Sequence, residues 1–309
     1  MITCPICTAK LLKYGFKRRY KNGDKEPYYQ CKNAEDHKKY WFESELGRTT
    51  NVIPNILLLD IETAPIDAYV WSLWKQNVYI DQIISNWFML TWSAKWLFDD
   101  KVMAQRLTPE EVELEDDKRI TKKLWNLLNK ADIVIAHNGD KFDIPKILSR
   151  CIVNDIKPPT PYQSIDTCKV ARKQFGFSSN KLDALATEFG FENKIDTDFN
   201  LWKRCRRGEK KALKEMEEYN RYDVVLLEEV YLKLRPYIKS HPNLGLYNDV
   251  VTPQCGNCGS ENIEWKGDYY FTPAGKYKAF ICECGAVNRT KFNELGTRKN
   301  KTLLRSTAR

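Results

Sequence analysis

The chain has 309 residues, of which 42% are hydrophobic, and it carries a net charge of +9. This length holds one domain of ordinary to large size with small appended modules, and the apolar content is sufficient for a hydrophobic core. We find no apolar stretch of roughly 18 residues and no secretory signal, so we expect a cytoplasmic, reducing setting and no membrane partner.

The positive charge belongs to the two ends of the chain. Residues 1–50 carry 11 Lys and Arg against 6 Asp and Glu, residues 51–242 carry 29 of each, and residues 243–309 carry 10 against 6. Basic ends on a neutral centre are typical of modules that touch a polyanion, most simply nucleic acid. The alternative is an ordinary set of solvated Lys and Arg side chains.

Residues 1–50 form the first predicted module. Cys4 and Cys7 have the spacing of a zinc knuckle, and Cys31 follows a Tyr-rich stretch. His37 is the nearest candidate for a fourth ligand, so we expect a Cys3His zinc site. A module this small needs such a metal to hold it together. The alternative is a loose basic arm in which two thiols are close by chance.

The apolar run at residues 56–62 is predicted to be a buried strand that begins the central domain, residues 51–242. It ends in two carboxylates, Asp60 and Glu62, which point to the same face because side chains on a strand alternate. Two neighbouring carboxylates repel each other unless a cation lies between them, and hard ions such as Mg²⁺ prefer oxygen ligands. The strand therefore predicts part of a divalent metal site.

Aromatic residues crowd the next segment, residues 69–98. Several of them alternate with polar residues, so we expect core packing for most, with base stacking as the alternative. Residues 87–98 and 101–107 read as a hairpin, and residues 110–129 as one amphipathic helix. The aromatic side chains are Trp71, Trp74, Trp87, Phe88, Trp92 and Trp96.

A second acidic motif follows a short buried strand predicted at residues 131–136. The loop from His137 to Asp143 should lie beside the tip of the first strand, and Pro145 suits the first turn of a helix. Beyond it we expect a strand at 164–167, a helix at 169–175, and a helix at 181–189 capped by Ser179 and Asn180.

A long helical pattern covers residues 209–235 and ends before Pro236. Tyr219 and Asp223 lie four residues apart on it and therefore share a face. An Asp among apolar neighbours is costly to bury without a partner. Before this helix, the basic cluster at residues 203–207 is either a contact for phosphates or a solvated turn.

The C-terminal residues 243–290 contain two pairs of thiols separated by a strand-like Tyr and Phe stretch. This pattern predicts a zinc ribbon, although the second pair is one residue tighter than a usual knuckle. Residues 291–309 are basic and poor in apolar side chains, so we expect a flexible tail. The four predicted zinc ligands are Cys255, Cys258, Cys282 and Cys284.

The central motifs together resemble those of the DEDD superfamily of 3′–5′ exonucleases, in the DEDDy subgroup that carries Tyr where the other subgroup has His. Residues 59–63 match the first motif, 137–143 the second and 219–223 the third. Each motif alone is weak, but their order and their places on strand, loop and helix make the set specific. The resemblance covers about residues 54–240 and leaves the zinc modules unexplained.

The resemblance implies an α/β, RNase H-like fold with a mixed central sheet and flanking helices. It also implies hydrolysis with two Mg²⁺ or Mn²⁺ ions, Asp60 bridging both. Glu62 and Asp223 would hold the ion on the side of the nucleophile, and Asp143 the other. Tyr219 would orient the attacking water, whereas the chemistry does not demand His137. Expected substrate contacts are Thr63, Asn138, Phe142, Arg204, Arg206 and Arg207.

We therefore expect a 3′–5′ exonuclease with two structural zinc ions, acting on single-stranded DNA alone or beside a polymerase or other DNA-processing protein. RNA stays open as a substrate because nothing in the sequence reads a 2′-hydroxyl. The alternatives are an RNase or structure-specific endonuclease of the same fold, and a catalytically silent adaptor that binds nucleic acid.

Overall fold

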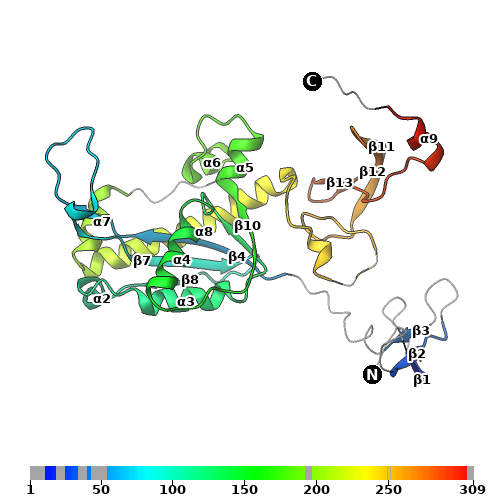
Figure 1. Cartoon of the computed structure of the whole chain (residues 1–309), viewed down its shortest axis with the longest axis horizontal. Coiled ribbons are helices and arrows are strands. Elements are labelled where there is room, and N and C mark those ends of the chain that lie inside the picture. The colour runs from blue at the N-terminus through cyan, green and yellow to red at the C-terminus, as the bar shows by residue number, and fades with distance from the viewer. Residues whose placement is uncertain are drawn as a thin grey trace. The chain divides into compact units, whose positions relative to one another are not determined.

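The computed structural model describes residues 11–18, 25–33, 40–42, 54–191, 197–248, 250 and 252–304 (Figure 1). The chain divides into two units, residues 54–242 and residues 1–53 together with 243–309. Among the described residues, no helix combines the length and apolar character that crossing a membrane requires.

A five-stranded mixed sheet forms the centre of residues 54–242, in the order β10-β9-β4-β7-β8. The middle strand β4 pairs in parallel with β9 and antiparallel with β7, so the expected mixed α/β architecture is confirmed. The strands are β4 Ile56–Thr63, β7 Met89–Trp96, β8 Met103–Arg106, β9 Ile133–Ala136 and β10 Gln163–Asp166.

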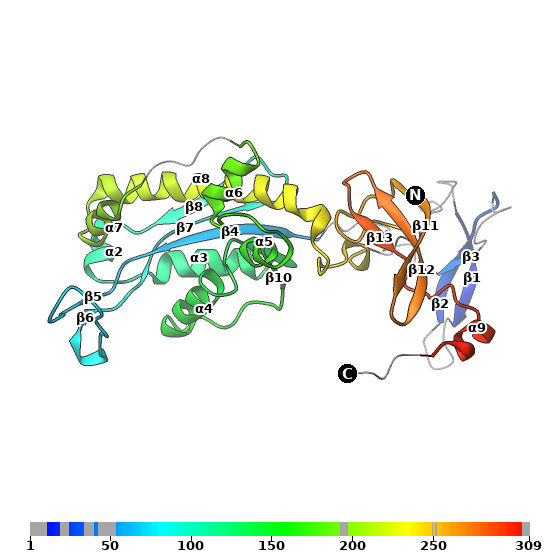
Figure 2. The same ribbon diagram turned by 90° about the horizontal axis from the view of Figure 1, so that it is seen from above.

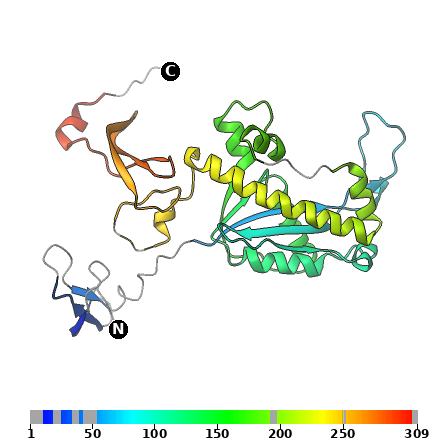
Figure 3. The same cartoon turned by 180° about the vertical axis from the view of Figure 1, so that it is seen from behind.

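Helices cover both faces of this sheet, which explains why β4 is apolar along most of its length (Figure 2). On one face Leu57, Leu59 and Ile61 pack with α3 (Lys118–Leu128) and α4 (Asp143–Val153) in the main core. The long helix α8 (Lys210–Leu234) crosses the other face (Figure 3). Asp60 and Glu62 point to that face, because their carboxylates lie close to Asp223 of α8. The two acids therefore lie between the sheet and α8.

Smaller helices complete this unit. α5 (Thr167–Gln174) and α6 (Leu182–Glu188) pack against α8 and share a second apolar cluster with it. The expected cap of α6 by Ser179 and Asn180 is wrong, because its N-cap is Lys181, with no side-chain cap. The backbone carbonyl of Asn180 instead lies 2.9 Å from His137 Nε2.

The single helix expected at residues 110–129 is two helices, α2 (Pro109–Glu113) and α3. The chain turns between them at Glu115, whose φ of 53° is left-handed. The break brings Asp117 into the interior, where its carboxylate binds Arg150 and the backbone N–H of Met89. This buried ion pair, made with a distant residue, overrides the local helical pattern.

The basic cluster at residues 203–207, expected as a turn or phosphate contact, largely belongs to a helix, α7 (Phe199–Arg206). Asp198 caps this helix by accepting hydrogen bonds from Asn200 and Leu201. Leu201 and Cys205 are buried on its inner face, and they are the apolar positions that would have indicated a helix.

The aromatic segment divides into a buried part and an exposed part. Phe88 and Trp92 lie in the core, as expected, and Trp87 and Trp96 are half-buried. Trp71 and Trp74, however, are 94% and 82% exposed. They lie on a projection that we call the arm, residues 66–85, which contains β5 (Asp67–Ala68), η1 (Ile80–Gln82) and β6 (Ile83–Ser85) (Figure 1).

The described parts of the two ends contain small antiparallel sheets. Near the N-terminus these strands are β1 (Leu12–Arg18), β2 (Lys25–Gln30) and β3 (Tyr40–Phe42). The C-terminal sheet contains β11 (Ile263–Thr272), β12 (Gly275–Cys282) and β13 (Val287–Arg289). The remaining elements are η2 (Arg235–Tyr237), η3 (Leu244–Leu246) and α9 (Thr297–Thr302), the last within the predicted basic tail.

Candidate active site

Three carboxylates from two elements meet at the end of β4. Asp60 and Glu62 project from the strand, and Asp223 from α8. One oxygen of each lies within 4.8 Å of one oxygen of each other residue. Asp223 is buried, and the two strand acids are half-buried. Three negative charges this close repel each other strongly unless a cation or protons neutralise them.

Hydrogen bonds from neighbouring helices hold the two strand acids. Asn220 Nδ2 on α8 lies 2.6 Å from Asp60 Oδ2, and the Asn220 side chain is fully buried. Trp202 Nε1 on α7 donates to Glu62 Oε2 over 3.3 Å. Neutral amide and indole donors orient a carboxylate without cancelling its charge. The acids are therefore positioned and remain able to bind a cation.

Asp143 lies beside this group but is not part of the three. It is in the first turn of α4, and its Oδ1 accepts the backbone N–H of Ile61 over 3.1 Å. Burial, with a smaller effect from the negative charge of Asp166, raises the pKa of Asp143 to about 7. A cation nearby would lower that pKa, because it favours the charged carboxylate.

Tyr219 is on α8 one helical turn before Asp223, and its side chain is buried. Its ring packs edge to face against Trp202, with 6.0 Å between ring centroids. Burial and the negative charges of Asp223 and Glu62 raise the pKa of Tyr219 well above its ordinary value. Its hydroxyl is therefore protonated at neutral pH and acts as a hydrogen-bond donor rather than a base.

His137 has a structural place in the loop before Asp143. Its Nδ1 lies 2.8 Å from Thr167 Oγ1, and its Nε2 contacts the backbone of the segment before α6. Burial lowers the pKa of His137, so the ring is neutral at pH 7. The next residue, Asn138, has a left-handed φ of 64°, and its N–H donates to Asp166.

The predicted substrate contacts lie in different surroundings. Thr63 follows Glu62 at a shift in the pairing of β4 with β7, and Phe142 is 37% exposed beside Asp143. The three predicted arginine contacts differ in whether acidic side chains already pair with them. Arg206 pairs with Asp67 and Glu115, Arg204 pairs with Glu209 and Glu215, and Arg207 is exposed.

Sequence reasoning missed three residues of this site. Asn220 lies inside the third motif, three residues before Asp223, and this helical spacing could have indicated that the two side chains lie close together. Trp202 belongs to the unrecognised helix α7. Asp166 caps α5 and holds the loop of the second motif, and its position near the end of the strand predicted at 164–167 was the usable sign.

The three carboxylates fit a divalent cation by their donor chemistry. Mg²⁺ and Mn²⁺ prefer carboxylate oxygens, and a cation would relieve the repulsion within the group. Asp60, Glu62 and Asp223 would hold such an ion, with Asp143 available beside them. The expectation that Asp143 holds a second ion stays a prediction.

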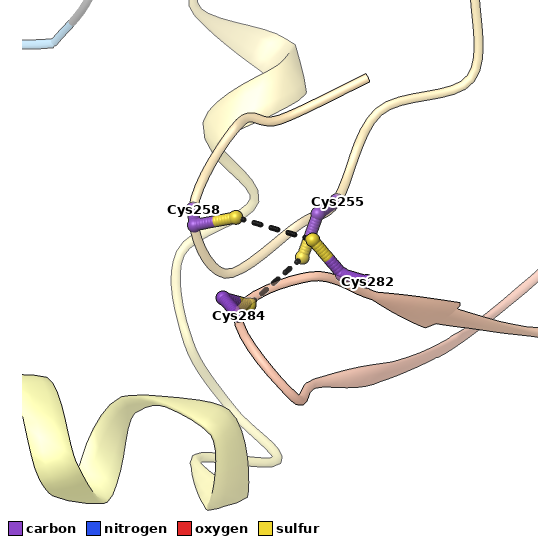
Figure 4. A group of neighbouring side chains, drawn as sticks. All are labelled: Cys255, Cys258, Cys282 and Cys284. Carbon is purple, nitrogen blue, oxygen red and sulfur yellow. Dashed lines mark hydrogen bonds between the residues drawn. The ribbon is translucent and has the colours of Figure 1, made fainter. Parts of the chain in front are cut away.

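The C-terminal cysteines form a separate group, with their sulfur atoms gathered at one point (Figure 4). Two come from the loop before β11, one from the end of β12 and one from the turn after β12. The Sγ atoms of Cys258 and Cys282 are 3.4 Å apart, and those of Cys255 and Cys284 are 3.8 Å apart. Sulfurs bound tetrahedrally at about 2.3 Å from Zn²⁺ are about 3.8 Å apart, so the group fits this ion.

Further contacts around this group resemble the outer shell of a metal site. Asn288 Nδ2 lies 3.2 Å from Cys255 Sγ, and its side-chain oxygen accepts the N–H of Gly256. Of the predicted N-terminal zinc ligands, only Cys31 is described, and its thiol is buried. Cys4, Cys7 and His37 lie outside the described residues, so that site stays a prediction.

Comparisons with known proteins bear on the fold. Residues 96–235 match the model of a family described as the RNase_H superfamily, a range that includes Asp143, Tyr219 and Asp223 but begins after Asp60 and Glu62. No curated protein sequence matches the chain.

One similar solved structure is the family B DNA polymerase from the hyperthermophilic archaeon Pyrobaculum calidifontis. It has 13% sequence identity and a TM-score of 0.44, over 74% of this chain and 28% of the polymerase. The chain thus spans less than a third of that protein's length. The mixed sheet with its flanking helices is consistent with an RNase H-like fold, and residues 96–235 are similar to that superfamily.

Proposed function

We propose that the chain is a metal-dependent 3′–5′ exonuclease that hydrolyses phosphodiester bonds of single-stranded DNA. The observation that carries the proposal is the convergence of Asp60, Glu62 and Asp223 within 4.8 Å from a strand and a helix far apart in sequence. The match of residues 96–235 to the RNase_H superfamily supports a nuclease. The 3′–5′ direction rests on the order of the three sequence motifs.

A pair of divalent cations supplies an activated water and neutralises the leaving oxygen in this class of reaction. Asp60, Glu62, Asp223 and Asp143 would hold the pair. Among the chain's own groups, Asn220 keeps the Asp60 carboxylate oriented, and the Trp202 indole does the same for Glu62.

The Tyr219 hydroxyl can position a reactant but does not act as the base. Because its raised pKa keeps the proton in place, it can donate a hydrogen bond to the attacking water or to the scissile phosphate. In the structure this single proton is donated to Asp223, so donation to a reactant would require the hydroxyl to turn away from that carboxylate. Tyr219 thus orients a reactant and leaves proton removal to another acceptor.

Single-stranded DNA is the proposed substrate because the basic ends of the chain suit a flexible polyanion. The C-terminal cysteine group, which would hold a structural Zn²⁺, keeps its module folded. A polymerase or other DNA-processing protein remains a proposed partner.

The direct test uses single-stranded DNA and RNA labelled at the 5′ end, with Mg²⁺ or Mn²⁺. Wild type should convert the DNA to a ladder of shortening labelled products, and Asp60→Ala should leave it intact. Release of the labelled 5′ nucleotide in the first turnover would contradict the direction. Equal cutting by Asp60→Ala would falsify the assignment of the site.

The remaining alternatives separate in the same assay. A circular single strand is untouched by an exonuclease and is cut by an endonuclease. Faster degradation of RNA than of DNA would make the chain an RNase. Binding without cleavage of either strand would leave an adaptor function.

A further inference from the structure

A groove beside the second motif is lined by cations that no step of the proposed reaction uses. Its volume is about 390 Å³, and it lies between the loop after β9 and α5. We call it the cationic groove. Its lining residues are Asn138, Asp140, Lys141, Asp166, Lys169, Arg172 and Lys173.

The two acids of this groove are already engaged within the fold. Asp166 is buried and accepts the backbone N–H groups of Asn138 and Lys169, which makes it the organiser of the loop. Asp140 accepts from Ser164 Oγ and lies 3.3 Å from Lys169 Nζ. Lys169 offsets the charge of Asp140, whereas Asp166 keeps its charge, so four cations line the groove against two carboxylates.

Three cations remain to face the solvent. Lys141, Arg172 and Lys173 are exposed, and none of them forms an ion pair with another described residue. Arg172 and Lys173 come from the last turn of α5 and Lys141 from the loop, so the charges approach the groove from two sides. The groove therefore has an excess of positive charge available to a ligand.

The groove lies on the edge of the sheet that carries the candidate active site. β9 and β10 run parallel to β4, and Ile135 of β9 pairs with Leu58, two residues before Asp60. The loop that leaves β9 ends at Asp143, which binds the backbone of Ile61. In parallel sheets, ligands bind at the carboxyl ends of the strands, where this loop and α5 begin.

We propose that the cationic groove binds phosphate groups of the nucleic-acid strand whose end lies at the three carboxylates. The proposal rests on the proposed nuclease function and adds a path for the substrate's backbone. Arg binds phosphate through a planar fork and Lys through a compact charge, and neither reads base identity. The groove should therefore add affinity without sequence preference.

The test removes two charges from the groove and measures binding as a function of salt. We would compare wild type with Arg172→Gln/Lys173→Gln, using a fluorescein-labelled oligothymidylate, fluorescence anisotropy and no added divalent metal. Each phosphate contact to a single strand contributes about 0.7 to the slope of log K against log salt. We expect the slope to fall by about 1.4 in magnitude and by about 0.7 in Lys141→Gln.

The matched control is Lys122→Gln/Lys123→Gln, which removes two exposed charges from α3. It should keep the wild-type slope. A wild-type slope in Arg172→Gln/Lys173→Gln, or an equal loss in the control, overturns the proposal. Thermal melting checks that each variant is folded, and Lys141→Gln, which leaves α5 intact, decides the matter if the double variant unfolds.

The binding assay separates this proposal from the proposed function because it requires no cleavage. If the variants show the expected change in slope but wild type cuts neither DNA nor RNA, the groove proposal stands and the exonuclease proposal fails. If wild type degrades DNA but both double variants keep the wild-type slope, the exonuclease proposal stands and the groove proposal fails.

Discussion

Asn220 Nδ2 lies 2.6 Å from Asp60 Oδ2, so a buried amide on α8 holds the carboxylate at the tip of β4. This contact joins the helix to the strand at the point where the proposed metal ligands meet. Hydrogen bonds to charged groups contribute about 1.5–3 kcal/mol. We expect Asn220→Ala to lower the free energy of unfolding by about 2 kcal/mol and to weaken binding of Mg²⁺.

Thermal unfolding and titration calorimetry with Mg²⁺ check this prediction. Lys214→Ala serves as the control, because Lys214 is on the same helix with its side chain 69% exposed. Its change in stability should stay within about 0.5 kcal/mol. An Asn220→Ala protein that melts and binds Mg²⁺ like wild type would show that Asp60 needs no support from α8.

Tyr219→Phe keeps the ring that packs against Trp202 and removes only the hydroxyl. If the hydroxyl orients a reactant, kcat should fall by about 100-fold, as for other single hydrogen-bond donors in active sites. The melting temperature should change little. Steady-state kinetics on single-stranded DNA measure the effect, and an unchanged kcat would remove Tyr219 from the proposed mechanism.

Asn138 offers a way to separate backbone shape from side-chain chemistry. Its φ of 64° is strained for most residues, so Asn138→Ala should cost about 1–2 kcal/mol of stability, whereas Asn138→Gly should cost much less. If the amide contacts the substrate, both variants should raise KM. A wild-type KM in Asn138→Gly would leave Asn138 with a backbone role alone.

His241 predicts a pH dependence of stability in a place remote from the carboxylates. Burial lowers its pKa, and its Nε2 lies 2.9 Å from the hydroxyl of Tyr231. The unfolded chain, with a His pKa near 6.5, then binds more protons than the folded chain. The contribution of His241 to stability should fall as the pH drops below about 6.5, by at most about 1.4 kcal/mol per pH unit. Asp143 contributes with the opposite sign below about pH 7, because burial raises its pKa, so the effect of His241 is read from the difference between variant and wild type.

Chemical denaturation at several pH values between 5 and 8 measures that slope. His241→Gln should make the slope smaller. Part of the slope should remain, because burial also lowers the pKa of His137. An equal slope in His241→Gln and wild type would mean that His241 titrates alike in the folded and unfolded chains.

The cysteine group predicts a metal content. Elemental analysis should find two zinc ions per chain, one for each predicted module, and Cys282→Ser should lose one of them. Chelation should unfold the C-terminal sheet because the bound metal supplies its folding energy. One zinc ion in wild type and none in Cys282→Ser would contradict the predicted N-terminal site and support the C-terminal one.

Local patterns predicted much of the domain that holds the site. The apolar run before Asp60 appears as β4 at Ile56–Thr63, and the helical pattern around Tyr219 appears as α8. Alternation placed Asp60 and Glu62 on one face of the strand, and the four-residue spacing placed Tyr219 and Asp223 on one face of the helix. The resemblance to the DEDD exonucleases then implied that the two faces meet.

Contacts between distant residues were not predictable in this way. The helix break at Glu115 depends on Asp117 reaching Arg150, and neither residue signals the other locally. Arg206 was an expected phosphate contact, yet it pairs with Asp67 at the base of the arm. A list of charges shows which side chains can bind an anion, but the fold decides which are already paired.

The exposure of Trp71 and Trp74 on the arm has a practical use. Indoles in water emit at longer wavelength than indoles packed in a core, such as Trp92. The tryptophan fluorescence of the arm should therefore shift to shorter wavelength when a macromolecule covers Trp71 and Trp74. A titration read by tryptophan fluorescence would reveal a ligand of the arm with no label attached.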